Sequence, residues 1–170
     1  MLDLNQFSIP TDPPKSVSLS HIEINQQFVD YQQLNDPDYR STFSFGKTIS
    51  EAFDSVSSFY NYPLELELPH HLDHLTFHFS AVDWDAPHKI QYSYKIEDLD
   101  KDWSLPSKES KAEYRNLPHG EFALKVKAIG EAQVWSEPFT YAFTIRPPWW
   151  QTWWAYLIYA LLFIAAIWSY

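Results

Sequence analysis

Four acidic side chains in one segment have the spacing of a calcium-binding loop. Asp98, Asp100, Asp102 and Glu109 stand at positions 1, 3, 5 and 12 of such a loop. Trp103 occupies position 6, where the sharp turn requires glycine, and no helices are expected on either side. We therefore predict that these acids bind no calcium.

Four histidines that are close in sequence raise the question of zinc: His70, His71, His74 and His78. On a helix His74 and His78 would share a face, but on a strand they lie about 13 Å apart, too far for one ion. We expect His78 on the polar face of a strand, and His70 and His71 as a solvated pair in a turn. No metal site and no cofactor are predicted.

Asp83 and Asp85 flank Trp84, and paired carboxylates are the machinery of glycosidases. Nothing in the sequence places two of them across a cleft, no GxSxG motif is present, and cysteine is absent. No catalytic residue is predicted, so we expect a protein that is not an enzyme. Trp84 is the best candidate for an exposed ligand contact, for instance by stacking on a sugar ring.

The charges lie in three zones along the 170 residues, whose net charge is −10. Residues 1–88 hold 3 basic and 13 acidic side chains, residues 89–146 hold 9 of each, and none follows Arg146. A nucleic-acid partner is excluded, because there is no basic stripe to bind phosphates.

Apolar and polar residues alternate with period two in several segments, which is typical of strands with one buried face. In the first of these segments the apolar residues change from odd to even positions between Leu19 and Ile22, which suggests a bulge or a break. The spacing of strands and turns predicts an all-β, immunoglobulin- or fibronectin-like antiparallel β-sandwich. The expected strands cover residues 17–24, 64–68, 75–81, 91–97, 112–117, 121–128 and 139–145.

Residues 149–170 carry no charge, and a helix of that length would be about 33 Å long, enough to cross a bilayer. We expect one C-terminal transmembrane helix within residues 147–170. Its interfacial aromatic residues would be Trp149, Trp150, Trp153, Trp154 and Trp168.

The domain organisation follows from these patterns: a linker at 1–14, a sandwich at 15–146 with an irregular insertion at about 26–62, and the helix. The N-terminus has no secretory signal. The chain is therefore either part of a larger exported protein or a tail-anchored protein with a cytosolic domain.

Four spaced motifs resemble the three-Y (Y_Y_Y) domain of two-component regulators. They are YSYKIEDLDKDW at 92–103, AEYRNLPHGEF at 112–122, VWSE at 134–137 and RPPWWQTWW at 146–154. The signature positions are Tyr92, Tyr94, Trp103, Tyr114, Gly120, Phe122 and Trp135. Trp103 and Trp135 are expected to fill core or corner positions. Two residues depart from the pattern: Phe122 replaces a tyrosine and Asp98 replaces a glycine.

The resemblance implies the membrane-proximal extracytoplasmic domain of a hybrid sensor histidine kinase, on the periplasmic side of a single-pass membrane protein. A β-propeller that helps to recognise a ligand, often a glycan-derived one, would precede it, and a histidine kinase would follow. We expect a signal-transmitting fragment that lacks both modules, with the lipid bilayer as a partner and a homodimer as one possible assembly. Two alternatives stay open: a membrane-tethered binding or adhesion module, and a carbohydrate-binding accessory domain.

Overall fold

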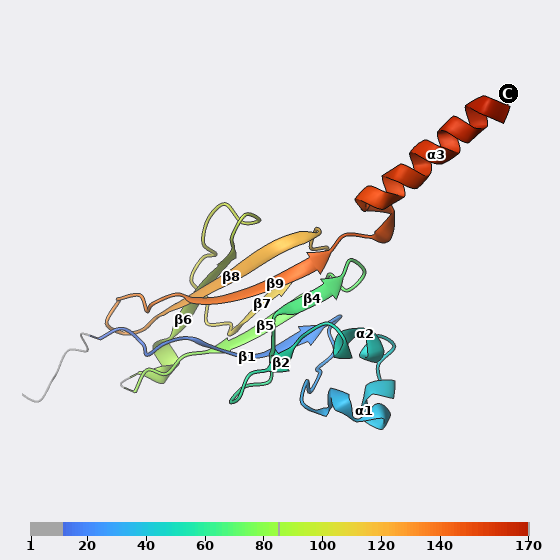
Figure 1. Cartoon of the computed structure of the whole chain (residues 1–170). Helices are drawn as coiled ribbons and strands as arrows, with labels where there is room; N and C mark the ends of the chain where they lie inside the picture. Colours follow the sequence, from blue (N-terminus) through green and yellow to red (C-terminus); the bar gives the residue numbers. More distant parts are fainter. Residues whose placement is uncertain (1–11, 85, 170) are drawn as a thin grey trace, which may run out of the picture.

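The alternating segments form strands, and most of these strands lie in two layers (Figure 1). The computed structural model describes residues 12–84 and 86–169. The strands are β1 (Ser18–Ile24), β2 (Ser55–Val56), β3 (Pro63–Leu64), β4 (Leu66–Pro69), β5 (Leu75–Ser80), β6 (Gln91–Ile96), β7 (Lys111–Tyr114), β8 (Gly120–Ile129) and β9 (Phe139–Arg146).

One layer has the strand order β1-β5-β7 and the other the order β4-β9-β8-β6, while β2 and β3 form a separate pair. All described pairs are antiparallel except β4 with β9, which run parallel from Leu66–Phe143 to Pro69–Arg146. A parallel pair needs a long connection between its two strands, and here residues 70–138, which contain β5 to β8, form that connection. The predicted all-β sandwich is confirmed, with one parallel pair where antiparallel strands were expected.

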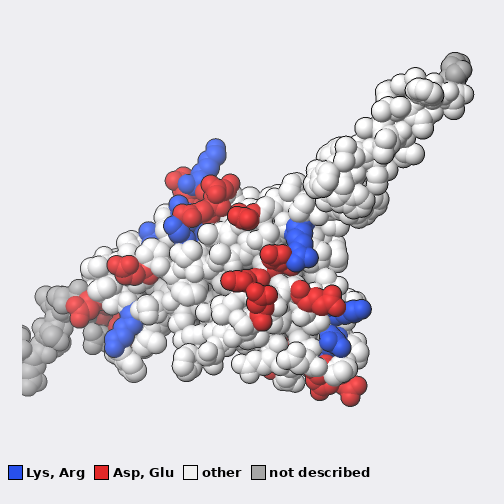
Figure 2. Space-filling view, in the orientation of Figure 1, with Lys and Arg blue, Asp and Glu red and all other residues white. Residues whose placement is uncertain are grey.

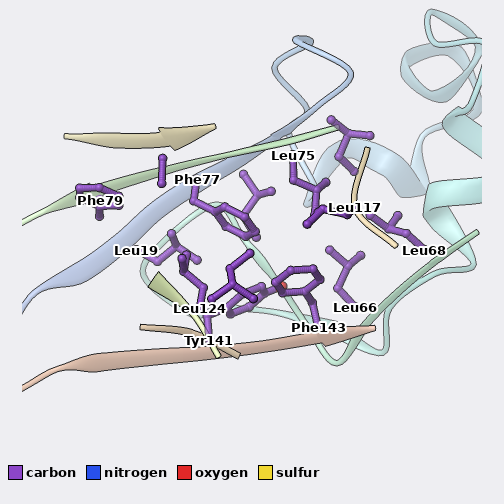
Figure 3. Packing of buried hydrophobic residues seen from close by; sticks show 14 of the residues in the cluster. Leu19, Leu66, Leu68, Leu75, Phe77, Phe79, Leu117, Leu124, Tyr141 and Phe143 are labelled. Atoms are coloured by element: carbon purple, nitrogen blue, oxygen red, sulfur yellow. The ribbon is translucent and has the colours of Figure 1, made fainter. Parts of the chain in front are cut away.

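The core lies between the two layers, where the apolar faces of the strands meet (Figure 3). Phe77 on β5 is fully buried and packs against Tyr141 and Phe143 on β9, with ring centroids 6.1 and 5.4 Å away. Truncating such a ring to alanine typically costs about 3–5 kcal/mol. These contacts hold the two sheets together.

A bulge in β1 reverses which side chains face the core. Leu19 pairs with Phe79 and His21 pairs with His78, so Ser20 is an extra residue on β1. Before the bulge Leu19 is buried, and after it Ile22 and Ile24 are buried. The predicted bulge is therefore confirmed, and it places His21 and Glu23 on the outer face.

The segment at about 26–62, expected to be irregular, contains short helices and contributes to the core. It holds a 3₁₀ turn (η2, Gln33–Asn35), helix α1 (Pro37–Ser41) and helix α2 (Gly46–Ser50). Tyr31 is buried and donates its hydroxyl to the carbonyl oxygen of Ile22 at 2.8 Å. Asn61 accepts from the backbone N–H of Tyr31 at 2.9 Å and donates to the carbonyl oxygen of Val29 at 2.7 Å. The Tyr31 hydroxyl ties the segment to β1, and the Asn61 bonds join the two ends of the segment.

The C-terminal helix is shorter than the sequence predicted. Pro148 and Thr152 are extended, with ψ of 149° and 152°, and a 3₁₀ turn (η4, Trp149–Gln151) lies between them. Helix α3 (Trp153–Ser169) has 17 residues and is about 25 Å long, less than the roughly 30 Å of a bilayer core. Among the described residues, no helix is both long and apolar enough to cross a membrane. The predicted transmembrane helix is therefore wrong, because it counted residues 149–152 as helical.

Helix α3 extends away from the sandwich, and its described side chains carry no charge (Figures 1 and 2). The charged side chains visible on that face lie over the sandwich and the short helices (Figure 2). The uncharged zone of the sequence is thus a separate structural element.

Candidate functional site

The three signature tyrosines link strands of both layers. Tyr92 and Tyr94 lie on β6, and Tyr114 lies on β7. The buried Tyr92 accepts a hydrogen bond from the backbone N–H of Ala81 at 3.1 Å. The Tyr94 and Tyr114 rings meet edge to face at 6.1 Å. Burial raises the pKa of both Tyr94 and Tyr114, so their hydroxyls stay protonated and able to donate.

Asp100 is held by hydrogen bonds within the chain. Its Oδ2 accepts from the backbone N–H of Ile96 at 2.8 Å and from the Tyr114 hydroxyl at 2.7 Å. Asp98 and Asp102 are exposed, and Asp98 has a φ of 65°. Of the acids with calcium-loop spacing, Asp100 thus stabilises the turn after β6, and among the described residues these acids form no metal-binding group.

Trp103 and Trp135 lie on either side of Lys127 and outside the core. The Lys127 ammonium is 4.2 Å from the centroid of Trp103 and 4.4 Å from that of Trp135. The Lys95 ammonium lies 5.4 Å from Trp103. Both indoles are half-buried rather than core residues. They form cation–π contacts, worth about 0.5–2 kcal/mol each, on the outer face of the β6–β8 pair.

Gly120 and Phe122 lie at the start of β8. Gly120 has a φ of 146°, a conformation that L side chains rarely adopt, which explains the glycine of the signature. The Phe122 ring packs on Phe143 with centroids 5.6 Å apart. Phe122 contributes packing without the hydroxyl that the family pattern offers.

Trp84 projects from the loop between β5 and β6 and is 78% exposed. The Lys15 ammonium lies 5.9 Å from its ring centroid. The predicted carboxylate pair around it is not seen as a unit, since Asp85 lies outside the described residues. An exposed indole is able to stack on a flat apolar surface, and its role as a ligand contact remains a prediction.

The remaining tryptophans lie at the junction between β9 and α3, except Trp168, which lies near the end of α3. The Trp150 ring meets the His70 ring edge to face at 5.2 Å, so His70 contacts this junction. The membrane-interface role of the tryptophans depended on the span that the structure does not support. Five of them are exposed: Trp149, Trp150, Trp153, Trp154 and Trp168.

The four histidines with close spacing in the sequence have different neighbours in the structure. His74 bonds to the Glu113 carboxylate at 2.8 Å, while His78 stacks on His21 with centroids 4.2 Å apart. Glu23 lies beside this stack. Sequence reasoning missed His21 and Glu23, although the parity switch in β1 was the signal that could have placed them on the same face as His78.

Comparison with known proteins identifies part of the chain. Residues 84–146 match the family model described as the Y_Y_Y domain, which confirms the resemblance found in the sequence motifs. Histidine kinase P4 of Formosa agariphila is 27% identical over 97 residues, which are 56% of this chain and 7% of that protein.

Solved structures share the fold at low identity. The extracellular domain of BT3049 from B. thetaiotaomicron, assigned to a hybrid two-component system, has a TM-score of 0.53 and 20% identity over 85% of this chain. The extracellular domain of BT4673 from the same organism has a TM-score of 0.56 and 22% identity over 85% of this chain. The chain spans 16% and 17% of those two structures, so it corresponds to a small part of each.

Proposed function

We propose that the Y_Y_Y segment at 84–146 and the strands packed on it form a non-catalytic module of a two-component sensor. The module would work on the extracytoplasmic side and pass a structural change from a ligand-recognising partner to a kinase. The matched family, the similarity to a histidine kinase and the fold shared with extracellular sensor domains support this proposal.

The continuous connection from β9 to α3 carries the proposal. β9 is an inner strand, paired with β4 on one side and β8 on the other. Its last residue, Arg146, bonds to the Glu67 carboxylate on β4 at 2.7 Å. Six residues, 147–152, then lead to α3, and two of them are prolines whose φ is fixed. A displacement of the sheet would therefore move the start of the helix.

Such a relay needs two states of the sandwich that the ligand-bound partner favours unequally. To move a population from 1:99 to 99:1, the favoured state must gain about 5.5 kcal/mol. The Arg146–Glu67 ion pair is exposed, and a surface pair of this kind contributes at most about 1 kcal/mol, too little to supply this free energy. We therefore place ligand recognition in a partner domain, with a β-propeller and a histidine kinase as the expected neighbours and a glycan-derived compound as the ligand.

Uncoupling the junction tests the relay. A flexible Gly/Ser linker inserted after Arg146 in a full-length receptor that contains this chain should abolish ligand-dependent kinase activity while leaving basal activity measurable. The matched control is the same linker after Leu105, which is 88% exposed in the loop between β6 and β7. Ligand-dependent activity that survives insertion after Arg146 would contradict the relay.

A binding or adhesion module without signalling is the main rival, and flanking DNA distinguishes the two. A kinase-like reading frame beyond codon 170 would support the sensor. Unrelated sequence on both sides would support the rival.

A carbohydrate-binding role is favoured by one observation, the exposure of Trp84. If it is correct, oligosaccharides should bind the chain and Trp84→Ala should abolish that binding. Loss of binding in Trp84→Ala with an unchanged melting temperature would establish the contact, whereas the absence of any binding would leave the sensor proposal as it stands.

A further inference from the structure

The outer face of the three-stranded sheet brings together two histidines and a glutamate that the proposed function does not use. His21 and Glu23 lie on β1, and His78 lies opposite His21 on β5. One ligand atom from each residue lies within 4.8 Å of those of the other two. The side chains are about a quarter exposed, at 25%, 26% and 26% respectively, so the cluster lies at the surface of the sheet.

The bulge at Ser20 creates this arrangement. In a regular strand, His21 and Glu23 would share the parity of the buried Leu19 and point into the core. The extra residue turns both side chains outward, onto the face that His78 already occupies.

The distances between the ligand atoms are close to those of groups that share one ion. His78 Nε2 lies 3.3 Å from Glu23 Oε1, and His21 Nε2 lies 3.7 Å from the same oxygen. Two ligand atoms bound tetrahedrally at about 2.1 Å from zinc are about 3.4 Å apart. The two imidazole rings are stacked, with centroids 4.2 Å and planes 11° apart, so the partly exposed His21 ring has to rotate before both nitrogens can point at one ion.

One nitrogen of the cluster makes no hydrogen bond to the described residues, although the Glu23 carboxylate lies 3.3 Å from it. His78 Nε2 is withdrawn from solvent and makes no hydrogen bond within the described part of the chain. A buried polar atom without a partner is costly, and a bound cation would satisfy it.

The neighbours allow a cation to bind. Lys111 on β7 pairs with His78 in the sheet, but it is exposed and able to keep its ammonium in water. The Phe28 and His21 rings meet edge to face at a centroid distance of 5.2 Å.

We propose that His21, Glu23 and His78 bind a divalent transition-metal ion of the kind that prefers imidazole, with zinc as the first choice. Two nitrogens and one carboxylate oxygen leave a fourth position for water or another ligand. The ion would fasten β1, an edge strand of its sheet, to β5. This site does not depend on the sensor proposal, and it departs from the absence of metal expected from the sequence.

Metal titration of the whole chain tests the site. Calorimetry with zinc chloride should show one ion per chain, and Co²⁺ should give the visible absorption of a tetrahedral complex. Zinc should raise the melting temperature, because it binds only the folded arrangement. His78→Ala and Glu23→Gln should each weaken zinc binding at least tenfold.

The matched control is His119→Ala, which removes an exposed histidine outside the cluster and should bind zinc as the unaltered chain does. Glu23→Gln keeps the size of the side chain, so it carries the test if His78→Ala fails to fold. Zinc affinity that is the same in the unaltered chain and in Glu23→Gln would overturn the proposal, as would the absence of binding in the unaltered chain.

Discussion

Replacing Asp100 by alanine removes a carboxylate that two donors share. The side chain accepts from the backbone N–H of Ile96, a fully buried residue, and from the Tyr114 hydroxyl. These bonds join β6 to β7 through the turn between them. The prediction is that the acid is structural, and that the calcium-like spacing of its neighbours is incidental.

The cost follows from the two bonds. A buried N–H left without a partner costs about 1–3 kcal/mol, and the partly exposed Tyr114 hydroxyl loses about 1 kcal/mol when water replaces the carboxylate. Together they predict a loss of about 3 kcal/mol in the free energy of unfolding. For a chain of this size that corresponds to a fall of roughly 6–12 °C in melting temperature.

Thermal unfolding followed by circular dichroism measures this loss, with Asp102→Ala as the control. Asp102 belongs to the same loop but is exposed and has no hydrogen bond or ion pair within the described residues. Its replacement should change stability by less than about 0.5 kcal/mol. In a double-mutant cycle, Tyr114→Phe should cost about 1 kcal/mol alone and almost nothing when Asp100 is already alanine.

Two results would refute the structural role of Asp100. One is an equal loss of stability in the Asp100 and Asp102 variants. The other is a melting temperature of the unaltered chain that rises with added Ca²⁺ and no longer responds to Ca²⁺ when either acid is replaced.

Three further predictions concern side chains on the sheets and turns. Glu113→Gln should lower the melting temperature at pH 7 but not near pH 2. Hydrogen bonds from Arg115 and then His74 depress the pKa of Glu113 to about 2. The stability that the Glu113 carboxylate contributes is therefore complete above its unfolded pKa and is lost as the pH falls through about 2. An equal effect of the substitution at both pH values would count against this prediction. Asp98→Gly should be more stable than Asp98→Ala by about 1 kcal/mol in chemical unfolding, because the φ of 65° favours glycine, and equal stabilities would contradict this. Phe122→Tyr should be neutral or slightly stabilising, since the ring is only partly buried and borders a surface hollow, and a fall of several degrees in melting temperature would show this to be wrong.

Much of the sandwich was predictable from the sequence because burial acts locally on strands. Leu75, Phe77 and Phe79 alternate with polar neighbours and are buried, as the period of two requires. The parity switch near Leu19 predicted the bulge in β1 for the same reason. The Y_Y_Y motifs were visible as well, because their tyrosines and turns are close in sequence.

The helical segment at 26–62 and the start of α3 were not predictable in this way. Tyr31 and Asn61 are held by hydrogen bonds to groups that are distant in sequence, and the segment has no clear period to reveal them. The uncharged tail predicted a helix, but the extended conformations of Pro148 and Thr152 shortened it. A stretch without charged residues shows roughly which part of the chain is apolar. It does not show at which residue a helix begins.

The sequence by itself determined the strands of the two layers, their buried faces and the position of the bulge, because each depends on residues that are neighbours along the chain, while the short β2–β3 pair was missed. Only the tertiary structure decided which side chains meet. Asp100 meets Tyr114, Lys127 lies between Trp103 and Trp135, and His78 comes to lie beside Glu23. Strand register sets these contacts, and register depends on the packing of the whole sandwich rather than on any one segment.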